Sequence, residues 1–242
     1  KAVEIKPDDY KSLCNWGGAL IDLSRLREGA EKESLLKDAI EKFARAVEIK
    51  PDDYQTLYNW GNALIGLADQ CEGDEKESLL KEAVEKYARA VKIKPDEHEV
   101  LCNWGNALVD LYHLREEAER ESLLKEAIEK YAKAVEIRPD KHESLCNWGN
   151  ALGQLSYLQS GKQRVETLKT ALEKSRQAEK LEAGTGIYNM ACFYALLGQK
   201  KRALTALKKA MEYDPSTKKR AFEDQDFLSL RCDKSFAALV SE

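Results

Sequence analysis

Four tryptophans at a constant interval of 44 residues constrain this chain more than any other feature: Trp16, Trp60, Trp104 and Trp148. Three of them lie in the hexapeptide Asn-Trp-Gly-Asn-Ala-Leu, and the first lies in the variant Asn-Trp-Gly-Gly-Ala-Leu. A fixed period of a few tens of residues is typical of a solenoid, in which each unit buries its apolar face only against its neighbours. The sequence therefore predicts a stack of similar units.

Each unit has the pattern of two helices. In the first helix, apolar residues such as Leu13, Trp16 and Leu20 recur at steps of three and four residues, which places them on one helical face. A second apolar stripe ends shortly before a proline, as at Pro51. The glycine after each tryptophan lies inside the first helix, where it costs about 1 kcal/mol relative to alanine. Its recurrence predicts a close approach between helices at that point.

These residues resemble the tetratricopeptide repeat. The family signature has a small residue on the first helix, alanine, aromatic and alanine positions along the second, and then proline. The matching sets are Gly17, Ala39, Phe43, Ala46 and Pro51; Gly61, Ala83, Tyr87, Ala90 and Pro95; and Gly105, Ala127, Tyr131, Ala134 and Pro139. The resemblance implies an all-α, right-handed solenoid of antiparallel helix pairs. The usual unit has about 34 residues, so the longer units predict extended helices.

The register of the motif predicts the boundaries of the units. A fourth copy keeps Gly149 but has Ser175 at the aromatic position, and a fifth unit has the ordinary length. We expect the tail of a preceding, incomplete repeat at 1–8, repeats at 9–51, 52–95, 96–139, 140–183 and 184–216, and a C-terminal capping segment at 217–242.

Composition excludes several classes of function. The net charge of −4 and the absence of a basic stripe argue against nucleic-acid binding. No apolar run approaches the roughly 20 residues that a membrane-spanning helix needs, so no membrane insertion is expected. The six cysteines show no metal-ligand spacing and are expected to be reduced thiols. This favours the cytoplasm or another reducing intracellular compartment.

The resemblance implies that the first helices line a concave groove that binds a peptide or partner segment. Asparagine is a poor helix former, so its recurrence on these helices needs a reason. Its amide both donates and accepts, so a ladder of amides could hold an extended peptide backbone. Alternatively, the same amides bond to neighbouring helices and fix the stack. The candidate binding residues are Asn15, Asn59, Asn62, Asn103, Asn106, Asn147, Asn150 and Tyr58.

Other family members capture acidic tails with lysines at the position that holds Cys14, Tyr58, Cys102 and Cys146 here. A charge-assisted clamp on the first helices is therefore not expected. The tryptophans are interpreted as core residues, because they belong to the apolar stripe. No nucleophile, base or ligand cluster predicts a catalytic residue, a metal site or a cofactor.

The sequence therefore predicts a non-enzymatic scaffold that binds a protein or peptide partner in its groove. Two alternatives stay open. One is a scaffold that assembles end to end as a homo-oligomer through exposed apolar repeat ends. The other is a regulatory or substrate-recruiting arm of a larger enzyme. The fold alone does not identify the partner.

Overall fold

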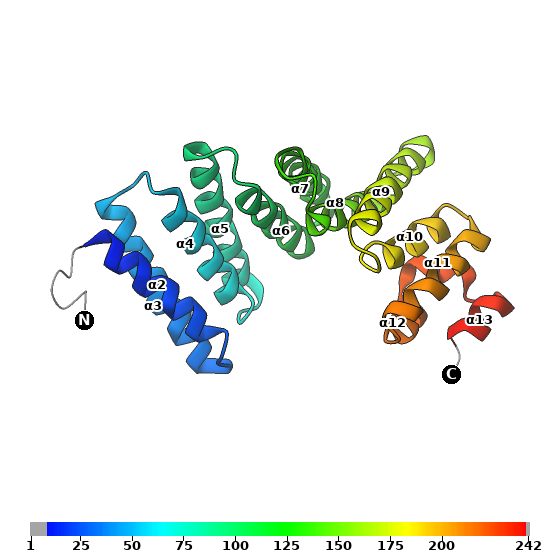
Figure 1. The fold of residues 1–242 in the computed structure, drawn as a ribbon, viewed down its shortest axis with the longest axis horizontal. Helices are drawn as coiled ribbons and strands as arrows, with labels where there is room; N and C mark the ends of the chain where they lie inside the picture. The colour runs from blue at the N-terminus through cyan, green and yellow to red at the C-terminus, as the bar shows by residue number, and fades with distance from the viewer. Residues whose placement is uncertain (1–8, 241–242) are drawn as a thin grey trace. The chain divides into compact units, whose positions relative to one another are not determined.

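The computed structural model describes residues 9–240, so the predicted repeat tail at 1–8 lies outside the described residues. The chain divides into two compact units, Lys1–Ile137 and Arg138–Glu242, and each is described by itself. Every regular element in the described residues is helical, and the helices form antiparallel pairs (Figure 1). The predicted all-α fold class is confirmed. The predicted repeat boundaries stay predictions.

The first unit consists of three helical hairpins. In each, a helix of 15 or 17 residues is followed by a helix of 21 residues. The long helix of one hairpin contacts the first helix of the next, so the hairpins stack in chain order (Figure 1). The pairs are α2 (Tyr10–Ser24) and α3 (Gly29–Ile49), α4 (Tyr54–Ala68) and α5 (Gly73–Ile93), and α6 (His98–Leu114) and α7 (Glu117–Ile137).

The second unit contains one long hairpin, one short hairpin and a closing segment. The closing segment contacts α10 through η1, and its Phe227 and Phe236 rings are buried and stack with centroids 5.5 Å apart. Burial of these two rings covers the end of the short hairpin. The elements are α8 (His142–Tyr157), α9 (Gly161–Leu181), α10 (Ile187–Leu196), α11 (Lys200–Tyr213), α12 (Thr217–Glu223), η1 (Gln225–Leu230) and α13 (Lys234–Val240).

The glycine after each tryptophan marks a close helix–helix approach, as the sequence predicts. A Cβ atom added at Gly61 would lie 2.5 Å from Cε1 of Tyr87, and one added at Gly105 would lie 2.6 Å from Cε1 of Tyr131. A Cβ atom added at Gly17 would lie 2.7 Å from Cε1 of Phe43. In the first unit, the signature aromatic of each long helix therefore packs directly on the backbone of the preceding helix.

The tryptophans are less buried than the core interpretation predicts. Trp16 is 41% exposed, and the other three are half-buried. A lysine from the long helix of the same hairpin lies over each ring, with Nζ between 3.7 and 4.8 Å from the ring centroid. The pairs are Lys42 with Trp16, Lys86 with Trp60, Lys130 with Trp104 and Lys174 with Trp148. Each of these rings, which the core only partly encloses, therefore also has a cation–π contact.

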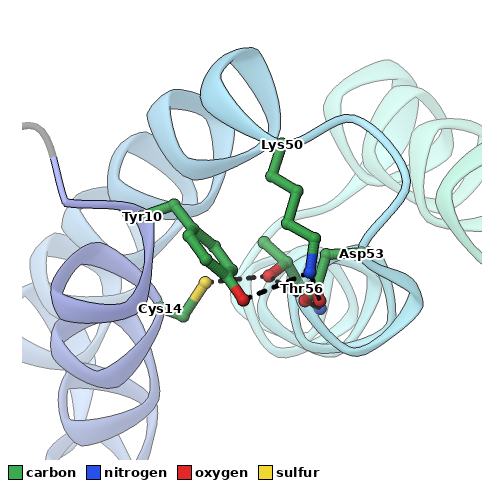
Figure 2. Close-up of polar contacts among 5 residues, drawn as sticks. All are labelled: Tyr10, Cys14, Lys50, Asp53 and Thr56. Carbon is green, nitrogen blue, oxygen red and sulfur yellow. Dashed lines mark hydrogen bonds and ion pairs between the residues drawn. The ribbon is translucent and has the colours of Figure 1, made fainter.

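Polar contacts join α2 to the following hairpin (Figure 2). The Lys50 ammonium lies over the Tyr10 ring, donates to the Tyr10 hydroxyl at 3.2 Å, and pairs with Asp53 at 3.3 Å. Asp53 caps α4 by accepting the Thr56 N–H at 3.0 Å. Cys14 Sγ and Thr56 Oγ1 lie 2.8 Å apart. Lys50, which precedes Pro51, thus ties the first hairpin to the second, and Lys94, which precedes Pro95, repeats the contact with Tyr54 and Glu97.

Candidate functional site

The second asparagine of the hexapeptide is bonded to the signature tyrosine of the same hairpin. The Tyr87 hydroxyl donates to Asn62 Oδ1 at 2.8 Å, and the Tyr131 hydroxyl donates to Asn106 Oδ1 at 2.7 Å. The glycine that precedes each asparagine lets the tyrosine ring lie against the first helix. Glycine, asparagine and tyrosine therefore act as one packing unit in these two hairpins.

The first hairpin lacks both partners of this hydrogen bond. Its signature aromatic is Phe43, which has no hydroxyl, and Gly18 stands where the later copies have asparagine. The amide and the hydroxyl are thus present together or absent together across the first unit. This pattern is expected if the amide is needed to satisfy a hydroxyl enclosed between helices, because a buried unpaired polar group is costly.

A second set of bonds joins the amides of neighbouring hairpins. Asn103 Nδ2 on α6 donates to Asn62 Oδ1 at 3.0 Å and to the Tyr58 hydroxyl at 3.3 Å, both on α4. Burial raises the pKa of Tyr58 and of Tyr87. Both phenols therefore remain neutral near pH 7 and can donate and accept hydrogen bonds.

Asn62, Tyr87 and Asn103 line a small pocket of about 140 Å³ between the first helices α4 and α6. Asn62, Asn103 and Asn106 supply amides, the half-buried Ile65 supplies apolar surface, and the buried Ala107 lies beneath them. Asn106 is exposed, whereas Asn62 and Asn103 are half-buried. The pocket can therefore offer amide groups to a peptide backbone beside a short apolar surface.

The structure brings together four of the eight predicted residues, namely Tyr58, Asn62, Asn103 and Asn106. The other four do not line this pocket. Asn59 Oδ1 accepts a bond from Gln55 at 3.3 Å, and Asn15 is exposed on α2. Asn147 and Asn150 lie on α8 of the second unit. A role for all eight in binding stays a prediction.

Sequence reasoning missed three residues of the pocket: Ile65, Tyr87 and Ala107. The sequence pattern places Tyr87 in the packing signature alone. The signal that identifies it is the joint change from tyrosine and asparagine to Phe43 and Gly18 in the first copy. Ile65 and Ala107 carry no such signal, because the sequence pattern assigns apolar residues of the first helices to packing between helices.

Among the described residues, one group could offer three metal ligands: Cys192, Asp224 and Asp226 in the second unit, with ligand atoms within 4.8 Å of one another. Its carboxylates already have protein partners. Asp224 accepts the Tyr188 hydroxyl at 2.6 Å, and Asp226 accepts the Tyr157 hydroxyl. Burial, aided by the charge of Asp224, raises the pKa of Asp226. We interpret the group as the anchor of η1 on α8 and α10.

The helices of residues 9–240 include none that is both long enough and apolar enough to span a lipid bilayer. All six cysteines are free thiols.

Several solved structures share the fold. YrrB, described as a TPR protein with an unusual peptide-binding site, aligns with a TM-score of 0.64 and 19% identity over 95% of each chain. TTC0263, a thermophilic TPR protein of Thermus thermophilus, aligns with a TM-score of 0.56 and 19% identity, over 96% of this chain and 99% of its own. MamA of Desulfovibrio magneticus RS-1 aligns with a TM-score of 0.60 and 16% identity, over 83% and 96%. At such identities the likeness shows the tetratricopeptide-repeat fold alone.

No curated protein matches the sequence. A family model does match, over residues 2–98 and again over residues 77–195, and it describes the plant-specific mitochondrial import receptor subunit TOM20. The expectation of a cytoplasmic protein is therefore wrong, because the matching family is one of mitochondrial receptor subunits. The prediction of a non-enzymatic protein-binding domain agrees with this family. Since the two matches together span most of the sequence, the chain belongs to the plant-specific TOM20 family of mitochondrial import receptor subunits.

Proposed function

We propose that this chain is a receptor domain that binds targeting peptides of mitochondrial proteins on the first helices of its first unit. The observation that carries the proposal is the pocket between α4 and α6, where amides of Asn62, Asn103 and Asn106 adjoin Ile65 and Ala107. The family match supports the class of ligand, because an import receptor must recognise the segments that direct proteins to the mitochondrion.

The chemistry of the pocket suits such a ligand. Mitochondrial targeting segments are amphipathic, rich in arginine and poor in acidic residues. The apolar face of such a segment can contact Ile65, which is half-buried, while asparagine amides bond to its backbone or to polar side chains. The six lining residues include no lysine or arginine, so a basic peptide meets no direct charge repulsion at the pocket.

The hydrogen-bond network favours a preformed site. Asn103 is held by bonds to Asn62 and Tyr58, and Asn62 is held by the Tyr87 hydroxyl. Side chains fixed before binding lose less conformational entropy when a ligand arrives. The same bonds also stabilise the stack, so the structural and the binding roles of these asparagines are compatible.

The test is a fluorescence-anisotropy titration with a labelled amphipathic, arginine-rich targeting peptide. A scrambled peptide of the same composition, without an apolar face, serves as the ligand control. Replacing Asn103 and Asn106 together by alanine should weaken binding on the order of tenfold or more, because each amide bond contributes about 1 kcal/mol.

The matched protein control is Gln163→Ala, an exposed amide on the long helix α9. It should leave the affinity unchanged, and circular dichroism should confirm that both variants remain helical. Equal affinity of the double variant and the parent protein would refute the site. Equal affinity for the scrambled peptide would refute recognition of an amphipathic ligand.

A further inference from the structure

The short hairpin of the second unit contains an open groove of about 330 Å³ between α10 and α11. From α10, Ile187, Met190 and Tyr194 face it at steps of three and four residues. From α11, Lys201, Arg202 and Lys209 are among the lining residues. None of the three cations falls within the residues that the family model matches, since that match ends at residue 195.

The floor of the groove is apolar and recessed. Ile187 is 5% exposed, Tyr194 is 8% exposed and Ala206 is 5% exposed. The Tyr194 hydroxyl accepts a hydrogen bond from Arg176 of α9 at 3.2 Å, and the Arg202 guanidinium lies 5.8 Å from the Tyr194 ring centroid. The tyrosine is therefore held in place below a cationic rim, which consists of Lys201, Arg202 and Lys209.

The rim carries more positive charge than its neighbours neutralise. Lys209 pairs with Glu179 at 3.3 Å, and the other oxygen of that carboxylate accepts the N–H groups of Gly184 and Gly186. Arg202 donates to the neutral amide of Gln199 at 2.8 Å. Within residues 9–240, no carboxylate forms an ion pair with Lys201 or Arg202. Both side chains are exposed and can receive anionic groups from outside the chain.

We propose that this groove is a second docking surface, for a peptide segment of a partner protein in which carboxylates flank an apolar side chain. The apolar side chain would enter between Ile187, Met190 and Tyr194, and the carboxylates would pair with Lys201 and Arg202. Arginine can receive a carboxylate through two parallel bonds, which fixes its orientation. The ligand is opposite in charge to the arginine-rich targeting peptides proposed for the first unit.

Other anionic partners fit the groove less well. A lipid surface is bound by apolar side chains that protrude into the interface, whereas Ile187 and Tyr194 are recessed. A nucleic acid requires an extended basic stripe, whereas three cations line one groove of a chain whose net charge is −4. A peptide that is both acidic and apolar fits better, because its carboxylates can pair with the rim while its apolar side chain contacts the floor.

The test uses the whole chain and the fluorescein-labelled peptide Gly-Glu-Leu-Glu-Glu-Leu-Glu-Gly, with companion peptides in which glutamine or lysine replaces every glutamate. We expect saturable binding of the glutamate peptide, weakening as ionic strength rises and surface charges are screened. The double variant Lys201→Gln, Arg202→Gln should weaken binding by about tenfold or more, as expected for the loss of two charge-assisted contacts.

Lys208→Gln is the matched control, because Lys208 is exposed on the same helix and does not line the groove. It should bind the glutamate peptide as the parent chain does, and circular dichroism should show the same helix content in all variants. Equal affinity of the double variant and the parent, or equal binding of the lysine peptide, would overturn the proposal. Binding to vesicles of anionic phospholipid without binding to the peptide would also overturn it.

Discussion

The Tyr87 hydroxyl donates a hydrogen bond of 2.8 Å to Asn62 Oδ1, across the point where α5 presses on Gly61 of α4. The bond joins the packing signature of the repeat to the residue proposed to bind peptide. Replacing either side chain should therefore change the stability of the hairpin and also the surface that is proposed to bind peptide.

A double-mutant cycle on Asn62 and Tyr87 should measure a coupling of about 1 kcal/mol, the usual net value of one intramolecular hydrogen bond. Tyr87→Phe removes the donor, Asn62→Ala removes the acceptor, and the double variant removes both. Urea unfolding followed by circular dichroism gives the four free energies. Additive costs for the two single changes would show that the bond contributes nothing.

The first hairpin allows the same bond to be installed. Phe43→Tyr places a hydroxyl beside Gly18, where there is no amide to receive it, and should cost about 1 kcal/mol or more. Adding Gly18→Asn should recover most of that loss, again measured by urea unfolding. If the second change gives no recovery, the joint occurrence of tyrosine and asparagine has another cause.

Gly61 and Gly18 occupy the third and fourth positions of the hexapeptide in their repeats. Replacing each of them by alanine should change the stability of the protein in opposite directions. Gly61→Ala forces a Cβ atom to within 2.5 Å of Tyr87 Cε1 and should destabilise by about 1–3 kcal/mol through overpacking. Gly18→Ala has no atom within 4 Å of the new Cβ and should stabilise by about 0.5–1 kcal/mol, since alanine favours helix. Thermal unfolding of both variants checks the signs, and equal shifts would contradict the close approach.

Lys86→Met should reveal the contribution of the lysine over each tryptophan. The change keeps an apolar stem but removes a charge that lies 4.3 Å from the Trp60 ring centroid and is only 9% exposed. We expect a loss of about 1 kcal/mol. The control Lys81→Met removes an ion pair with Glu77 from the same helix, where Lys81 is 53% exposed, and should cost less than about 0.5 kcal/mol. Equal losses would show that the ring contact is not stabilising.

Asp53 should make the junction between the first two hairpins sensitive to acid. Burial pushes the pKa of this carboxyl upward, but bonds from Thr56 and Lys50 outweigh burial, and the net effect lowers the pKa from 3.8. A depressed pKa in the folded state contributes stability above the unfolded-state pKa. That contribution is lost as the pH falls through the folded-state value.

The measurement compares Asp53→Asn with the parent chain in urea at pH 7 and near pH 3. Asparagine keeps a helix-capping acceptor, so the difference isolates the charge. The parent should be the more stable at pH 7, and its advantage should shrink at the lower pH. Asp52→Asn, an exposed neighbour, is the control. An advantage that is independent of pH would refute the role of the carboxylate.

The sequence by itself determined the all-α class, the succession of helix pairs and the close approach at Gly61, because these follow from local periodicity and from a repeated register. It also identified the asparagines as the polar residues of the first helices. The family resemblance that the sequence carried was to the tetratricopeptide repeat in general. The mitochondrial receptor family, and with it the correction of the expected location, came from the match of residues 2–98 and 77–195 to the model of that family.

Only the tertiary structure decided how these side chains are used. Periodicity places Asn62 and Asn103 on first helices but cannot show that they meet, because their distance depends on how two hairpins stack. It places Trp60 on the apolar stripe but cannot show that the ammonium of Lys86, 26 positions later, lies over the ring. Nor can it show that Lys201 and Arg202 surround a recessed tyrosine. A helical pattern reports which face of one helix is apolar, whereas a site is formed by faces of several helices.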